Sequence, residues 1–124
     1  MRKIQDISVS FRIAVNADRT RILELLGKNK AAWEVSFKET ELISPKYFSI
    51  GRNTVEITYN EDYDEKFLTV QEDGYLYYKS HMDFYPKDDR VTLAGQIQLA
   101  KEISKKFADA GIASEIIAEF EHLL

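Results

Sequence analysis

Residues 74–86, GYLYYKSHMDFYP, form the central element of the predicted fold. An extended strand sends alternate side chains to opposite faces of a sheet, so this run predicts one core face and one polar face. The core face carries Leu76, Tyr78, Met82 and Phe84. The polar face carries Tyr77, Lys79, His81, Asp83 and Tyr85. Gly74 suits the turn before the strand, and Pro86 ends it because proline has no N–H for a sheet ladder.

Further runs of alternating apolar residues predict the other strands of the sheet. These runs cover residues 7–15, 33–37, 47–50, 54–59, 67–70 and 113–120. The end of the run that starts at Trp33 is open between Phe37 and Ile43, and Tyr59 is expected to face the core. A hairpin loop at residues 51–53 joins two of the strands, and the short strand 67–70 is expected to pair with the central one.

Two segments show the three- and four-residue spacing of amphipathic helices. The first covers residues 18–26, with Asn16 or Asp18 as its N-cap and Gly27 as its end. The second covers residues 92–110, between the N-cap Thr92 and Gly111. Both helices are expected to bury one apolar face against the sheet.

The order strand, helix, several strands, helix, strand predicts an α+β fold in one domain, residues 1–124. A helix that connects parallel strands makes a right-handed crossover, so both helices should cover one face of a mostly antiparallel sheet. This is the split βαβ plan of ferredoxin-like folds with an extra β-hairpin. Strand 7–15 should then lie beside the central strand, and the other face of the sheet should remain open.

Composition and charge exclude several classes of function. The 124 residues include no cysteine and two histidines, which excludes disulfides and a thiolate zinc site, so we expect no metal and no cofactor. Acidic residues outnumber basic ones by 21 to 17, whereas nucleic-acid-binding proteins usually carry a basic surface. The chain has no apolar run long enough for a signal peptide or a membrane span. We expect a cytoplasmic protein that binds neither nucleic acid nor membrane.

The acidic residues are concentrated between two of the predicted strands. Glu61, Asp62, Asp64 and Glu65 fall within five positions, with Lys66 beside them. Charge runs usually form a solvated loop. The alternative interpretation is an electrostatic docking site for a basic protein.

The polar face of the central strand contains the other candidate site. His81 and Asp83, with Lys79 and Arg12 nearby, can orient a general base or hold an anion. Such rows are more often exposed faces with ion pairs. The tyrosines can stack on nucleobases, which the acidic charge disfavours, or can bury area in a protein interface. The sequence contains no recognised catalytic motif, so we predict that the protein is not an enzyme.

The C-terminal half resembles small bacterial proteins with a ferredoxin-like plan, some of which are immunity proteins against toxins. The similarity lies in GYLYY, in DFYP and in AEFEHLL near the C-terminus. The residues that carry it are Gly74, Tyr75, Tyr77, Tyr78, Asp83, Pro86, Glu119, Phe120 and Glu121. The resemblance implies a protein partner.

Three hypotheses follow for the function. We prefer a protein-binding module, such as an immunity or inhibitor protein, that neutralises a basic partner through the acidic residues and the tyrosine-bearing face. The second is a small-ligand or substrate site around His81 and Asp83. The third is a self-associating structural domain in which two open sheets pack as a homodimer.

Overall fold

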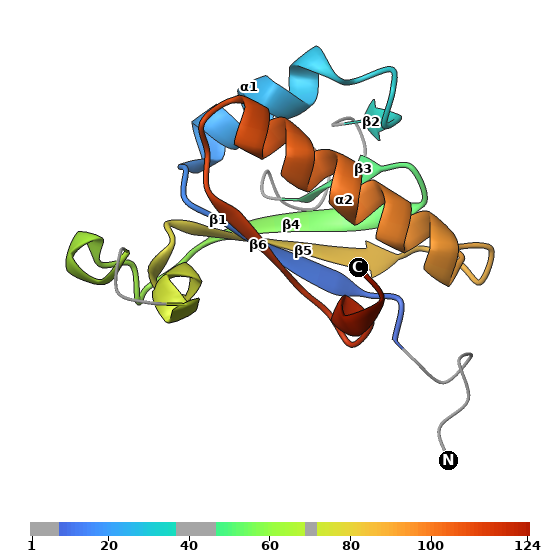
Figure 1. The fold of residues 1–124 in the computed structure, drawn as a ribbon. Coiled ribbons are helices and arrows are strands. Elements are labelled where there is room, and N and C mark those ends of the chain that lie inside the picture. Colours follow the sequence, from blue (N-terminus) through green and yellow to red (C-terminus); the bar gives the residue numbers. More distant parts are fainter. Residues whose placement is uncertain (1–7, 37–46, 69–71) are drawn as a thin grey trace.

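Six strands form one sheet in the computed structural model, which describes residues 8–36, 47–68 and 72–124 (Figure 1). Their order across the sheet is β2-β3-β4-β5-β1-β6, and every neighbouring pair is antiparallel. The strands are β1 (Phe11–Val15), β2 (Val35–Ser36), β3 (Tyr47–Ile50), β4 (Asn53–Tyr59), β5 (Ser80–Pro86) and β6 (Ser114–Ile117). The predicted α+β class is confirmed.

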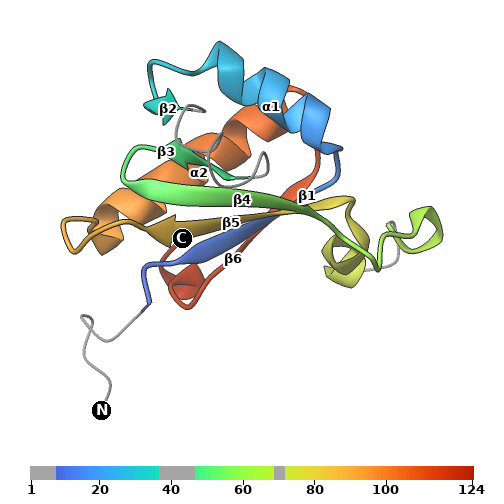
Figure 2. The ribbon, with the colours of Figure 1, turned by 180° about the vertical axis from the view of Figure 1, so that it is seen from behind.

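Two α-helices cover the same face of this sheet (Figures 1 and 2). Helix α1 (Arg19–Lys28) follows Asp18, whose carboxylate accepts a hydrogen bond from the backbone N–H of Arg21 at 2.9 Å. Asp18 is therefore the N-cap, and not Asn16. Helix α2 (Leu93–Asp109) follows Thr92, whose hydroxyl accepts from the N–H of Gly95 at 3.0 Å. Gly111 stops α2 with a φ of 76°, a conformation that favours glycine.

The position of β1 explains how the chain closes the sheet. β1 pairs with β5 on one side and with β6 on the other, both antiparallel. β5 and β6, which α2 connects, therefore run in the same direction but are separated by β1. The sequence argument correctly placed strand 7–15 beside the central strand.

The central strand is shorter than predicted. Residues Glu72–Tyr77 form the 3₁₀-helix η4, and β5 begins only at Ser80. The carbonyls of Leu76 and Tyr78 bind the side chain of Asn60, which holds this segment in a turn that alternation cannot reveal. Leu76, predicted to face the core, is 49% exposed. From Ser80 onward the predicted faces are correct, because Met82 and Phe84 are fully buried.

The other strand boundaries also differ from the predictions. β1 starts at Phe11, and Ile7 lies outside the described residues. β2 contains two residues, and positions 37–43 lie outside the described residues. The predicted strand 67–70 starts in the 3₁₀-helix η3 (Glu65–Phe67), while residues 69 and 70 are not described. β6 ends at Ile117, before the 3₁₀-helix η5 (Glu121–Leu123). Tyr59, predicted to face the core, is 67% exposed at the end of β4.

Aromatic side chains from four parts of the chain join the sheet to its covering layer. Phe11 and Phe84 are paired across β1 and β5, and their rings stack with centroids 4.2 Å apart. Phe120 contacts Phe11 edge-on at 5.8 Å. Phe107 of α2 is also fully buried in this cluster. The core thus lies between the sheet and the helices, which leaves the second face of the sheet available.

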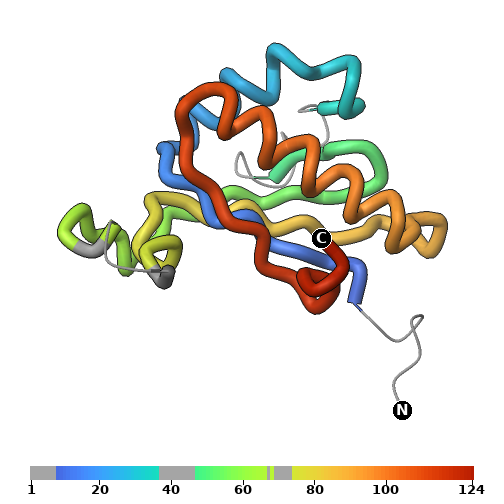
Figure 3. Tube along the Cα trace, in the orientation of Figure 1, coloured from blue at the N-terminus to red at the C-terminus, as the bar shows by residue number. Residues whose placement is uncertain are grey.

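Residues 60–68 and 72–78, between β4 and β5, project beyond one end of the sheet (Figure 3). This projection contains η3, η4 and the acidic run Glu61, Asp62, Asp64 and Glu65. Within the described residues, no helix has both the length and the apolar character that a membrane crossing requires.

Candidate functional site

A groove forms where this projection meets the open face of the sheet. Its volume is about 680 Å³, and the acidic segment 60–64 and η4 form its sides. β1, β5 and β6 contribute one side chain each to its floor. We call it the acidic groove, and its lining residues are Arg12, Asn60, Glu61, Asp62, Tyr63, Asp64, Tyr75, Leu76, Tyr77, His81 and Ile117.

Asn60 holds the two sides of the acidic groove together. Its side-chain N–H groups donate to the carbonyls of Leu76 at 2.9 Å and Tyr78 at 2.7 Å. Its side-chain oxygen accepts from the backbone N–H of Asp62 at 3.0 Å. Asn60 is 4% exposed, so these bonds are shielded from water. One buried amide thus bends the acidic segment and fixes it against η4.

Short-range contacts order the outer part of the projection. The carboxylate of Asp64 accepts from the N–H of Lys66 at 2.9 Å and caps η3. The hydroxyl of Tyr63 donates to Glu65 at 3.2 Å. The ammonium of Lys79 lies 5.5 Å from the centroid of the Tyr63 ring, which is cation–π distance. A tyrosine of the groove therefore already binds a cation on its face.

The floor of the groove contains an ion pair across two strands. Arg12 and Asp83 are register partners on β1 and β5. The Nε of Arg12 donates to Oδ1 of Asp83 at 2.7 Å and Nη2 donates to Oδ2 at 3.3 Å. This bidentate bond raises the pKa of Arg12. Both carboxylate oxygens of Asp83 accept from Arg12, so the charge of Asp83 is balanced by the guanidinium beside it.

His81 lies two register positions from this pair, opposite Ala14, and also lines the groove. Burial lowers the pKa of His81, and the positive charge of Arg12 lowers it further. The imidazole is therefore neutral at pH 7. Since Arg12 is paired with Asp83, the carboxylates of Glu61, Asp62 and Asp64 dominate the charge of the groove.

The structure brings together five of the nine predicted site residues. Those five are Glu61, Asp62, Asp64, Tyr77 and His81. Three more contact a groove residue without lining the groove: Glu65 and Lys79 through Tyr63, and Asp83 through Arg12. Tyr85 is separate, because it is the register partner of Thr54 near the other end of β5 and is 45% exposed.

Sequence reasoning missed Asn60, Tyr63, Leu76 and Ile117 as groove residues. Asn60 carried a usable signal, because an asparagine between a strand and a polar run often bonds the backbone two residues on. Ile117 carried none, since its place in the groove follows from its pairing with Arg12 across β1 and β6. In the described ranges, no group of three or more metal-ligating side chains converges on one point.

Comparisons of the chain with protein-family models, with curated proteins and with solved structures find no match. The geometry of the acidic groove is therefore the basis for the functional argument.

Proposed function

We propose that this chain is a non-enzymatic protein-binding module whose acidic groove takes a basic segment of a partner protein. One observation carries this proposal. Carboxylates of the segment 60–64 and tyrosines of η4, distant in the sequence, line a single groove beside the open sheet face. Three of the predicted docking residues, Glu61, Asp62 and Asp64, and the predicted tyrosine Tyr77 line this groove, whereas Tyr85 lies outside it.

Its chemistry suits lysine and arginine side chains. Within the described residues, Glu61 and Asp62 form no ion pair with a basic side chain. Tyrosine rings attract cations, and the contact of Lys79 with Tyr63 at 5.5 Å is an internal example. Leu76, 49% exposed at the same place, offers apolar contact to the stem of a long basic side chain.

The finer fold and partner hypotheses fit this proposal. The order β6-β1-β5-β4 corresponds to a ferredoxin-like plan, with β2 and β3 as the extra hairpin. We propose this assignment together with an immunity or inhibitor role, in which the groove covers a basic surface of the partner. Such a role requires no catalytic residue. The homodimer hypothesis stays a prediction.

The small-ligand hypothesis keeps one supporting observation. Arg12 and His81 face the same groove, so a small anion would meet both side chains there. Against it, Asp83 occupies the Arg12 guanidinium through two hydrogen bonds. The charge of the surrounding segment also repels anions. The two hypotheses therefore predict opposite ligand charges.

The test replaces the groove carboxylates without removing the cap of η3. Glu61→Gln, Asp62→Asn and Asp64→Asn together should slow association with a basic partner about tenfold at low salt and flatten its salt dependence. Asparagine at position 64 keeps the capping acceptor. The measurement is surface-plasmon kinetics at several salt concentrations, against a partner recovered by pull-down and against an arginine-rich peptide.

A matched variant changes the same number of charges elsewhere. Glu24→Gln, Glu102→Gln and Asp109→Asn lie on the helices, and association should keep its wild-type rate. Tyr77→Ala should weaken binding by about 1–2 kcal/mol, mainly through faster dissociation. Tyr85→Ala should leave the dissociation rate unchanged because Tyr85 lies outside the groove. Equal effects of the two charge variants, or tighter binding of anions than of cations, would overturn the proposal.

A further inference from the structure

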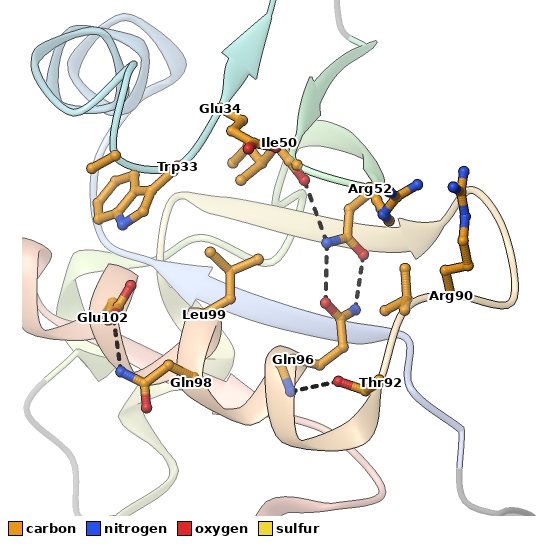
Figure 4. Close-up of a pocket in the computed structure, with 15 residues that line it drawn as sticks. Trp33, Glu34, Ile50, Arg52, Arg90, Thr92, Gln96, Gln98, Leu99 and Glu102 are labelled. Carbon is orange, nitrogen blue, oxygen red and sulfur yellow. Dashed lines mark hydrogen bonds between the residues drawn. The ribbon is translucent and has the colours of Figure 1, made fainter.

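A second cavity lies at the opposite end of β4 and β5, between the β3–β4 turn and the start of α2 (Figure 4). Its volume is about 370 Å³. Trp33, Ile50 and Leu99 give it apolar walls, while Arg52 and Arg90 stand together at one end (Figure 4). We call it the α2 cavity. It shares no residue with the acidic groove.

A buried pair of amide side chains, Asn53 and Gln96, also lines the α2 cavity. The side chains of Asn53 and Gln96 bond each other reciprocally, at 3.1 Å and 2.8 Å. The remaining N–H groups donate to the carbonyls of Ile50 at 3.4 Å and Val9 at 2.8 Å. All four side-chain N–H donors of the pair are thus used. The amide pair therefore has no side-chain N–H left to donate to a ligand.

The arginines are arranged to give such bonds. Asp88 accepts from Arg52 at 3.3 Å and from Arg90 at 3.1 Å, and both bonds go to the same carboxylate oxygen. Two guanidinium groups therefore share the one carboxylate of Asp88. Each guanidinium carries five N–H donors, which suit a carboxylate or phosphate.

The tryptophan end is held by strained backbone. Glu34, which lines the cavity next to Trp33, has a φ of 51°, a left-handed conformation that is unfavourable for a residue with a β-carbon. Its carbonyl accepts from the N–H of Gly51 at 3.2 Å, which ties the Trp33 segment to the β3–β4 turn. Strain of this kind persists where the surrounding structure needs one conformation, and it clusters at ligand sites.

We propose that the α2 cavity binds a small amphipathic anion, with its ring or short chain against Trp33 and Leu99 and its carboxylate or phosphate on Arg52 and Arg90. Ligand sites are concave and mainly apolar, with few polar groups that fix orientation, and they span roughly 300–1,000 Å³. The α2 cavity lies at the small end of that range, which favours a ligand with one ring. Glu102 lies toward Trp33, away from the arginines, so it orients the anionic group to the arginine end (Figure 4).

The experiment uses two probes that differ in charge alone. 4-Phenylbutyrate and 4-phenylbutan-1-ol are titrated into the ¹⁵N-labelled protein, and amide and indole shifts are followed by NMR. Trp33 is the single tryptophan of the chain, so its indole N–H signal reports directly on the cavity wall. We expect shifts at Trp33, Gly51 and Gly95, with the carboxylate binding at least fivefold more tightly than the alcohol.

Arg52→Gln with Arg90→Gln should reduce this preference to about one, and each single substitution should reduce it partly. Both side chains are largely exposed, at 49% and 68%, so the substitutions do not disturb the core. Arg21→Gln on α1 is the matched control and should keep the full preference. Equal binding of the two probes to the wild type, shifts confined to the acidic groove, or an unchanged preference in the double variant would overturn the proposal. Because the two sites share no residue, equal binding of the probes or an unchanged preference leaves the groove proposal untouched.

Discussion

A buried asparagine lies at each end of β4, and the two asparagines bind different kinds of partner. Asn53 is the first residue of β4 and Asn60 follows its last, with exposures of 2% and 4%. Asn53 bonds a side chain of α2, while the Asn60 side chain bonds backbone groups of neighbouring segments. Arg52 and Arg90 lie near the first end, and Glu61, Asp62 and Asp64 lie near the second. The same residue type can therefore join a helix to a sheet or shape a loop, according to what its amide meets.

The contact at the first end should have the larger effect on stability. Gln96→Ala should lower the free energy of unfolding by about 3 kcal/mol, since each buried polar group left unpaired costs roughly 1–3 kcal/mol. It leaves the amide of Asn53 and the carbonyl of Val9 without their partner. Denaturant unfolding gives the measurement.

Gln98→Ala provides the control at the first end, because the residue type and the helix are the same. The Gln98 side chain bonds Glu102 on the exposed surface, so its loss should cost no more than about 0.5 kcal/mol. A double-mutant cycle with Asn53→Ala then isolates the pair, and coupling below about 0.5 kcal/mol would contradict the assignment.

The contact at the second end should act locally. Asn60→Ala should lower stability by about 1–2 kcal/mol, because water can reach part of the projection once it loosens. Amide hydrogen exchange should speed up at Asp62 and Asp64, whose N–H groups are bonded within the projection. Amides of β5 should keep their protection. A uniform loss of protection along β4 and β5 would show that Asn60 supports the whole sheet instead.

Local sequence patterns correctly predicted the regular part of the central strand. They failed for the residues just before that strand, which do not form a regular element. Residues from Ser80 to Phe84 alternate as a strand must, and their core and open faces followed directly. Leu76 and Tyr78 continue the same alternation, yet they lie beyond the strand because Asn60 binds their carbonyls. The two hydrogen bonds from Asn60 span 16 and 18 positions of the sequence, so the local sequence does not encode them.

The candidate site was likewise predictable in part from the sequence. The acidic charge of Glu61, Asp62 and Asp64 was visible in composition, and so was its suitability for a cation. The meeting of those carboxylates with Tyr75 and Tyr77 was not, because it depends on how η4 folds back. The α2 cavity was invisible for a similar reason. Trp33 and Leu99 are each ordinary apolar residues of their own segments, and tertiary packing alone brings them into the lining of one cavity.

The smallest expected effect concerns the pH dependence at the second end. Burial and the charge of Arg12 on β1 lower the pKa of His81 below 6.5, while Asp83 on its own strand and Asp62 in the projection oppose this shift. Its register partners Ala14 and Thr58 carry no charge. The unfolded chain therefore binds a proton more readily, and stability should fall as pH drops from about 6.5 toward the folded-state value. His81→Gln should flatten this part of the profile and leave stability near pH 7.5 almost unchanged, with His122→Gln as the matched substitution. Urea unfolding at half-unit pH steps measures the free energy of unfolding, and a profile that His81→Gln leaves as steep as the wild type would contradict the burial of His81.

Protonation of His81 also places a positive charge in the acidic groove, so binding of a basic peptide should weaken over the same pH range. This effect on binding should disappear in His81→Gln.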